Sequence, residues 1–311
     1  MASEELVRGM LYVSLTVVGV PGNLAVILAF LSLLYQDKRL LVADVIVLHL
    51  ACVNLTAVAV RCLLETLASF RLAHIFDDAG CKGVIFVYRM SRSLSIWLTF
   101  VLSAYQCLSI APPGSRRASV RTSVARYLGP VFLVLWLVNA CMTSAAVLFS
   151  FGAGNASASH SINVEFCFVN FPSKLSKEAN GAAQVGRDVV PMALMALASL
   201  IILLFLYKQS RQARGRRGGG SERRAAKAVV TLVTLYVVLY GVDNGLWVYT
   251  LTVKKTMSSS LVSDLRIFFS SLYAALSPLV VIASNRKVNG RLGCAVKVRV
   301  GKEQAATLST I

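Results

Sequence analysis

The sequence is poor in charged residues. Only 15% of its 311 residues are Asp, Glu, Lys or Arg, whereas 56% are hydrophobic and the mean hydropathy is +0.68. Soluble chains carry about a quarter charged residues, so this composition excludes an ordinary soluble domain and also a disordered chain. Seven cysteines in 311 residues are too few for a scaffold built on disulfides. What remains is a polytopic membrane protein.

Enzyme motifs are also missing from the sequence. The three histidines form no His-Glu-x-x-His pattern, and there is neither a phosphate-binding loop nor a serine nucleophile elbow. We therefore expect no catalytic activity, no metal and no cofactor.

Long apolar runs are present instead. A helix needs about 20 apolar residues to cross a bilayer, and seven runs reach that length. They are residues 6–35, 42–70, 82–110, 127–151, 189–207, 228–253 and 261–282. Because backbone polar groups in lipid must be satisfied internally, each run is expected to be a helix. The sequence predicts an all-α membrane protein, a single seven-helix domain (1–311) whose last part, 283–311, is a tail.

The basic residues predict the orientation of this bundle. The net charge is +18, and twenty Lys and Arg residues follow the first, third, fifth and seventh runs, against nine on the opposite side. The positive-inside rule then places the N-terminus outside and the tail in the cytoplasm. The lipid surface accounts for the positive charge, so nucleic acid is not expected as a partner.

Two cysteines and one asparagine stand out on the predicted external side. Cys81 opens the third helix and Cys167 lies in the second external loop, and this is the one external cysteine pair in the sequence. An oxidising compartment favours a disulfide between them, which would hold the loop over the bundle. Asn155 begins an Asn-Ala-Ser glycosylation sequon in the same loop.

Charged and polar residues lie at membrane depth. The ligand-binding candidates are Arg61, Glu65, Tyr88, Arg89, Arg92 and Asp243. Charges there are costly and indicate function or internal pairing. Arg61 and Glu65 are four residues apart and can pair on one helix face. Polar residues at steps of three and four, from Tyr88 through Arg92 to Gln106, predict a stripe on the third helix that faces the bundle.

Two interpretations of these charges stay open. In the first, they form a closed network, such as Arg92 with Glu65 or Asp243, that only fixes helix packing. In the second, they line a polar pocket open to the outside. Three arginines against two acids leave one surplus positive charge, which favours a ligand with a carboxylate or sulfate group over an amine.

The predicted architecture resembles a G-protein-coupled receptor. Gly22-Asn23 and Trp136 fit the rhodopsin-like class, but several motifs depart from it. Asn54 stands where that class has an aspartate, and Tyr105-Gln106 replaces the acidic–arginine pair of the third helix. The sixth helix lacks a tryptophan–proline step, and Ser277-Pro278 replaces the Asn-Pro of the seventh.

These departures together resemble one family, the vomeronasal type 1 receptors and the class A-related olfactory receptors of fish. The matching stretches are His49-Leu50, Phe76 to Lys82, the third-helix pattern from Arg89 to Pro112, Arg187-Asp188, Glu222-Arg223 and Ser277-Pro278. Arg89 and Arg92 belong to the family pattern. Arg61 and Glu65 do not match it, which makes them the better candidates for ligand selectivity.

The resemblance implies a function. It implies a multi-pass receptor in the plasma membrane of chemosensory neurons that binds a small-molecule odorant or pheromone. It also implies activation of a heterotrimeric G protein of the inhibitory type. The expected partners are thus a small molecule, favoured as an anion, the G protein and the lipid bilayer. The alternative is a small-solute transporter, against which the odd helix number and the lack of an inverted repeat both count.

Overall fold

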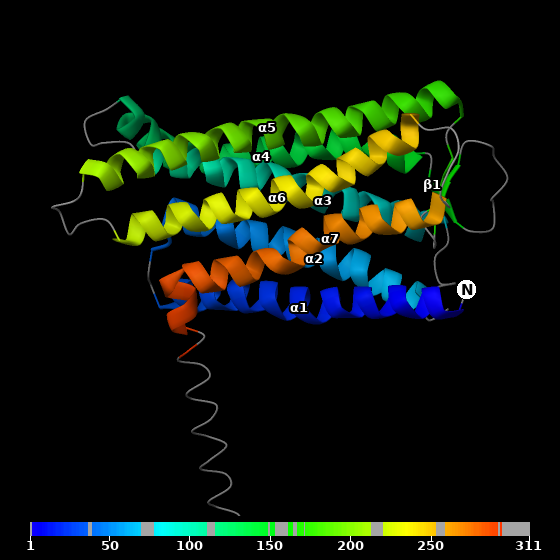
Figure 1. Cartoon of the computed structure of the whole chain (residues 1–311), viewed down its shortest axis with the longest axis horizontal. Helices are drawn as coiled ribbons and strands as arrows, with labels where there is room; N and C mark the ends of the chain where they lie inside the picture. Colours follow the sequence, from blue (N-terminus) through cyan, green and yellow to red (C-terminus); the bar gives the residue numbers. More distant parts are fainter. Residues whose placement is uncertain are drawn as a thin grey trace, which may run out of the picture.

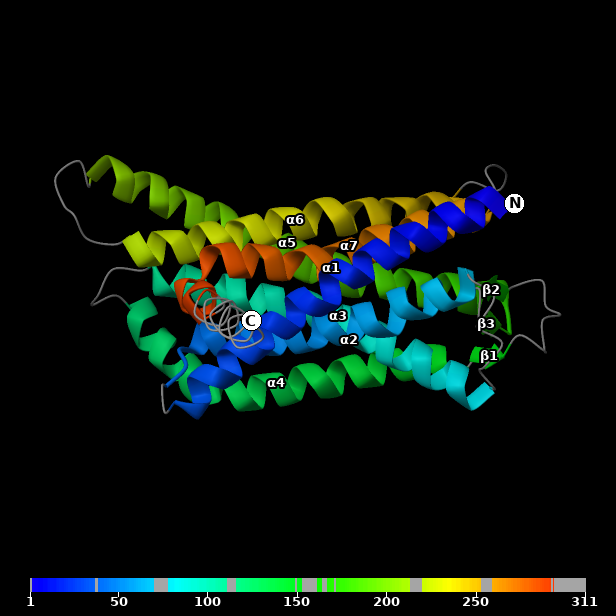
Figure 2. The ribbon, with the colours of Figure 1, turned by 90° about the horizontal axis from the view of Figure 1, so that it is seen from below.

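The computed structural model describes residues 2–36, 39–69, 78–110, 116–148, 150–152, 161–163, 167–170, 172–212, 220–252, 259–291 and 293. Within this part of the chain, seven long helices lie side by side in one elongated bundle (Figures 1 and 2). They are α1 (Ala2–Tyr35), α2 (Val42–Ser69), α3 (Asp78–Ser109), α4 (Arg116–Leu148), α5 (Lys174–Gln212), α6 (Gly220–Thr252) and α7 (Ser259–Ser284).

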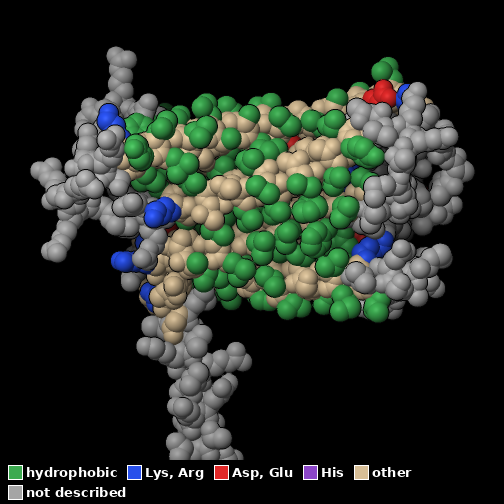
Figure 3. All heavy atoms as spheres, viewed as in Figure 1, with side chains coloured by type: hydrophobic (Ala, Val, Ile, Leu, Met, Phe, Trp, Pro, Cys, Tyr) green, Lys and Arg blue, Asp and Glu red, His purple; other side chains and the backbone are tan. Residues whose placement is uncertain are grey.

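Each of these seven helices contains a stretch long and apolar enough to cross a membrane. Hydrophobic side chains cover the flank of the bundle that Figure 3 shows, while Lys and Arg gather toward its two ends. On α4, the side chains of Leu133, Val134 and Leu137 are more than half exposed. Such a surface suits lipid and not water. The predicted seven-helix membrane fold is confirmed.

Several helices extend beyond the apolar runs. α5 begins at Lys174, fifteen residues before the expected start at Val189, and α4 begins at Arg116 instead of Tyr127. Hydropathy marks only the part of a helix that contacts lipid. Backbone hydrogen bonding continues through polar residues, and the Lys, Glu, Ala and Gln of the first turns of α5 are good helix formers.

A small antiparallel sheet lies between α4 and α5 and was not predicted. Its strands are β1 (Ser150–Gly152), β2 (Ser161–Asn163) and β3 (Cys167–Asn170), in the order β1-β3-β2. Phe168 of β3 is opposite Phe151 of β1 and Asn163 of β2. The sheet lies at the same end of the bundle as the N-terminus (Figure 1), which we call the sheet end, and β1 contacts α3. Asn155 lies outside the described residues.

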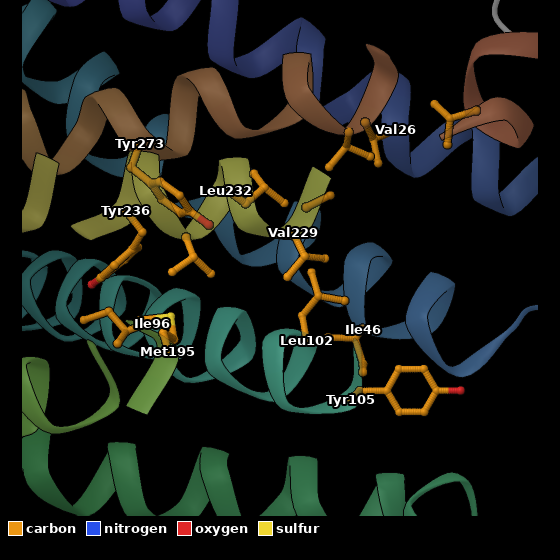
Figure 4. Packing of buried hydrophobic residues seen from close by; sticks show 14 of the residues in the cluster. Val26, Ile46, Ile96, Leu102, Tyr105, Met195, Val229, Leu232, Tyr236 and Tyr273 are labelled. Atoms are coloured by element: carbon orange, nitrogen blue, oxygen red, sulfur yellow. The ribbon is translucent and has the colours of Figure 1, made fainter. Parts of the chain in front are cut away.

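Helix α3 occupies the centre of the bundle and contacts α2, α4, α5 and α6. The polar stripe predicted on it is buried, since Ser95, Thr99 and Ser103 are each 1% exposed or less. Around the stripe, apolar side chains from all seven helices form the core (Figure 4). These include Val26, Ile46, Ile96, Leu102, Met195, Val229, Leu232, Tyr236 and Tyr273. The core thus holds α3 in place, and the polar face of α3 is directed toward the other helices.

Candidate functional site

Arg92, near the middle of α3, binds aspartates on two other helices. Its Nη2 donates to Oδ2 of Asp188 in α5 at 2.8 Å and to Oδ2 of Asp243 in α6 at 2.5 Å. Both carboxylates are 2% exposed. The guanidinium carbon of Arg92 also lies 5.1 Å from the centre of the Tyr240 ring, within the range of a cation–π contact. One side chain therefore joins α3, α5 and α6.

Each of these aspartates contacts a second arginine. Arg187 Nε lies 3.5 Å from Asp188 Oδ1, and Arg266 Nε lies 3.2 Å from Asp243 Oδ1. Asp188 and these two arginines were not among the predicted binding residues. Arg187 and Asp188 come directly before Val189, where the predicted fifth run begins. Because α5 begins at Lys174, they in fact lie more than three turns inside it.

Arg89 lies one helical turn from Arg92, toward the sheet end, and is partly exposed. Within the described part of the chain no carboxylate lies within ion-pair distance of it, and the guanidiniums of Arg187, Arg92 and Arg266 lie close enough to repel its charge. We call Arg89, Arg92, Arg187 and Arg266, with Asp188 and Asp243, the arginine cluster. It contains four positive and two negative groups, so the surplus is two charges, larger than predicted.

Arg61 and Glu65 form the predicted pair on α2. Arg61 Nη2 lies 2.5 Å from Glu65 Oε1, and their side chains are 3% and 0% exposed. The Arg61 guanidinium also lies 5.3 Å from the centre of the Tyr88 ring, and the Tyr88 hydroxyl is 3.0 Å from Ser270 Oγ in α7. Tyr88 and Arg92 are four residues apart on α3. The six predicted residues therefore form two neighbouring groups along one face of that helix.

A cavity of about 270 Å³ opens at the other end of the bundle, between α2, α3, α6 and α7. Leu102 and Leu232 line its apolar wall, and Tyr105 and Gln106 also face it. Lys287, in a short helical segment after α7 (286–291), lies 2.5 Å from Asp44 of α2 at its edge. The residues that replace the usual acidic–arginine pair of α3 thus lie at this cavity.

Residues 7–292 match the model of the vomeronasal organ pheromone receptor family. The chain belongs to this family. Olfactory receptor class A-like protein 1 of Danio rerio is 38% identical over 294 residues, covering 93% of this chain and 92% of the relative. Human vomeronasal type-1 receptor 1 is 24% identical over 296 residues, covering 93% of this chain and 83% of the relative. Vomeronasal type-1 receptor 4 of Pongo pygmaeus is 34% identical over 142 residues, 46% of each chain.

Family membership confirms the resemblance predicted from the motifs. This vomeronasal-type chain is a multi-pass membrane protein of a chemosensory G-protein-coupled receptor family, and that family is one of receptors and not of enzymes.

The structure explains one departure of this vomeronasal-type chain from the rhodopsin-like pattern. Asn54 is 1% exposed; its Oδ1 accepts a hydrogen bond from Ser95 Oγ at 2.6 Å, and its Nδ2 donates to Ser277 Oγ at 2.9 Å. An ionised aspartate only accepts hydrogen bonds, whereas an amide does both. With serine in place of asparagine in the seventh helix, asparagine at position 54 satisfies both partners.

Proposed function

We propose that this vomeronasal-type chain is a chemosensory receptor that binds a small-molecule odorant or pheromone toward the sheet end of its bundle and activates a heterotrimeric G protein at the other end. The observation that carries this proposal is the position of Arg92, which joins α3, α5 and α6. A ligand that exchanges contacts with this group changes how three helices pack, and such helix shifts are the usual means by which a bundle switches between two states.

The proposed orientation has the N-terminus outside and the tail in the cytoplasm, and it is supported by the twenty basic residues of the predicted inner side. An epitope tag inserted at Gly219, between α5 and α6, should bind antibody only after permeabilisation. A tag before Met1 should bind it on intact cells. Labelling of the Gly219 tag on intact cells would contradict the proposed orientation.

The proposed external features are a disulfide between Cys81 and Cys167 and a glycosylation site at Asn155. Cys81 is fully buried at the sheet end of α3. Cys167 is the first residue of β3, which pairs with β1, and β1 contacts α3. The backbone therefore brings the strand that carries Cys167 toward the helix that carries Cys81, as the proposed disulfide requires. Asn155, between β1 and β2, is the proposed glycosylation site.

The G-protein site is proposed at the cavity lined by Tyr105 and Gln106. An inhibitory-type G protein is proposed from the family. The basic residues between α5 and α6 would attract an acidic partner surface and anionic lipid. A cavity that already exists between α3 and α6 needs only to widen when these helices shift.

The experiment that tests the function measures G-protein activation in cells that express the chain. A panel of acidic, neutral and amine odorants is applied to the wild type and to Arg61→Lys, Arg89→Lys and Arg92→Lys. Lysine keeps the charge but loses the planar fork. We expect at least one variant with normal surface expression to shift the dose–response of an acidic agonist by about tenfold or more, and substitutions of Glu65, Tyr88 or Asp243 to alter it too.

Two results would count against this function. If no odorant activates a G protein while a radiolabelled one accumulates in vesicles, the chain is a transporter. If every surface-expressed arginine variant keeps normal potency, these arginines only hold the helices together.

A further inference from the structure

The four arginines of the cluster differ in how well they are neutralised. Arg92 is shared between two carboxylates at 2.8 and 2.5 Å, so its charge is satisfied inside the protein. The contact between Asp188 and Arg187 is longer, at 3.5 Å, and the other oxygen of Asp188 is bound to Arg92. Arg89 has no acidic partner among the residues that the structure describes. The uncompensated charge is therefore concentrated on Arg89 and Arg187.

Two further observations point to a missing partner at these residues. Arg187 is 4% exposed, yet no hydrogen-bond acceptor in the described part of the chain reaches its Nη2, which is fully buried. A buried charged donor without an acceptor costs free energy. Arg89 also lies one helical turn from Arg92, which binds Asp188, the residue next to Arg187, and the like charges of Arg89 and Arg187 are close enough to repel each other.

We infer that Arg89 and Arg187 form an anion site that takes the carboxylate or sulfate group of the small molecule. An acidic group placed between them would accept from Arg187 Nη2, pair with Arg89 and remove their mutual repulsion. This inference rests on the proposed function for the identity of the occupant, and it moves the ligand contact away from Arg61, whose side chain pairs with Glu65. The ligand class it names is an organic anion small enough to enter the bundle.

An empty anion site predicts an unusual effect of substitution on the stability of the receptor. A residue that holds the bundle together lowers stability when it is removed. Arg89 should do the opposite, since neutralising it relieves repulsion in the empty receptor. Arg89→Gln is therefore expected to melt at the same temperature as the wild type, or higher, in the absence of an anion. The same variant should lose the stabilisation that an anion provides.

The test uses the full-length receptor, purified into phosphatidylcholine nanodiscs. Its melting temperature is measured against increasing hexanoate, the matched neutral hexanamide, or added sodium chloride at equal ionic strength. Binding to the folded state raises the melting temperature with ligand concentration. We expect hexanoate to stabilise the wild type and hexanamide and chloride not to. Arg89→Gln and Arg187→Gln should each raise the half-saturating hexanoate concentration about tenfold or more.

The control variant is Lys174→Gln, which removes the same charge from an exposed position of α5 and should respond as the wild type does. Since Arg187→Gln also leaves Asp188 with one partner fewer, Arg187→Lys serves as a second variant that keeps the charge. Nanodiscs with phosphatidylglycerol and no hexanoate test the other source of an anion. Arg89-dependent stabilisation by this lipid would support the site and assign it to a lipid head group.

The inference is overturned if hexanoate stabilises Arg89→Gln as it does the wild type, or if hexanamide or chloride stabilises the wild type equally. It is also overturned if Arg89→Gln melts at a lower temperature than the wild type without any anion. Because no G protein is present, these results are independent of signalling. Anion binding without G-protein activation in cells would refute the proposed function and leave the site standing.

Discussion

Replacing Arg92 with methionine is expected to destabilise the bundle more than any change at its surface. Methionine keeps most of the apolar stem but removes the group that joins Asp188 and Asp243. Both carboxylates are 2% exposed and lose their shortest contact. Breaking a buried ion pair by removing one partner leaves a charge in a medium of low polarity, whereas the unfolded chain hydrates it.

The size of the stability loss depends on the contacts that the carboxylates of Asp188 and Asp243 keep in Arg92→Met. Removing one partner of a buried pair costs about 3–5 kcal/mol. Asp188 still has Arg187 at 3.5 Å and Asp243 still has Arg266 at 3.2 Å, and the surplus of positive charge falls, so part of this cost is recovered. We expect a loss of about 2–4 kcal/mol, which at about 2 °C per kcal/mol for a large domain lowers the melting temperature by about 4–8 °C.

The assay is thermal unfolding of the purified receptor followed with a thiol-reactive dye, for which the buried thiol of Cys62 is the reporter. The control is Lys174→Met. Lys174 and Glu178 form an exposed pair at 3.5 Å, and its loss should leave the melting temperature nearly unchanged. In a double variant with Asp188→Asn, the two losses should be less than additive, because both remove the same contact. An unchanged melting temperature in Arg92→Met, or fully additive losses, would refute the reasoning.

Three further predictions concern other parts of the bundle. Gly22→Ala should lower the free energy of unfolding by about 1–3 kcal/mol, because a Cβ on Gly22 of α1 would lie 2.9 Å from Cγ of the rigid Pro278 ring of α7. The control is Gly129→Ala, which should leave stability unchanged because a Cβ at that position meets nothing within 4 Å. Lys287→Met should raise agonist-independent G-protein activation per receptor at the surface, because it removes the 2.5 Å link to Asp44 beside the cavity; Arg39→Met, at an exposed position that does not line the cavity, is the control, and equal basal signalling in both would contradict it. Cys81→Ser and Cys167→Ser should each reduce surface expression, with the double variant no worse than either, and additive losses would speak against a bond between them.

The fold could be predicted because membrane helices are specified by composition over long stretches. Seven apolar runs gave seven helices, and the step of three and four residues gave the buried face of α3. The Arg61–Glu65 pair followed from spacing alone, since residues four apart on a helix are neighbours whatever surrounds them. Of the two partners suggested for Arg92, Asp243 is in contact with it.

The rest of the site could not be read from the sequence, because it depends on where α5 begins. The apolar run starts at Val189, so hydropathy left Arg187 and Asp188 outside the predicted fifth helix. The extra polar turns of α5 place both residues inside that helix, and Asp188 contacts Arg92. Arg266, near the start of the seventh apolar run, was one of the nine basic residues counted on the external side and was not considered as a site residue. The small sheet was missed because strands of three and four residues leave no periodic pattern.

The two polar groups along α3 indicate how the ends of the bundle are connected. Toward the sheet end, Arg92 joins α3 to α5 and α6 through charged contacts. One turn further along, Ser95 joins α3 to Asn54 of α2, and through it to Ser277 of α7. An anion near Arg89 would weaken the ion pairs of the arginines with Asp188 and Asp243. It would leave the hydrogen bonds between Ser95, Asn54 and Ser277 unchanged. We therefore expect α5 and α6 to move against a core of α2, α3 and α7, which is the motion that widens a cavity lined by α3 and α6.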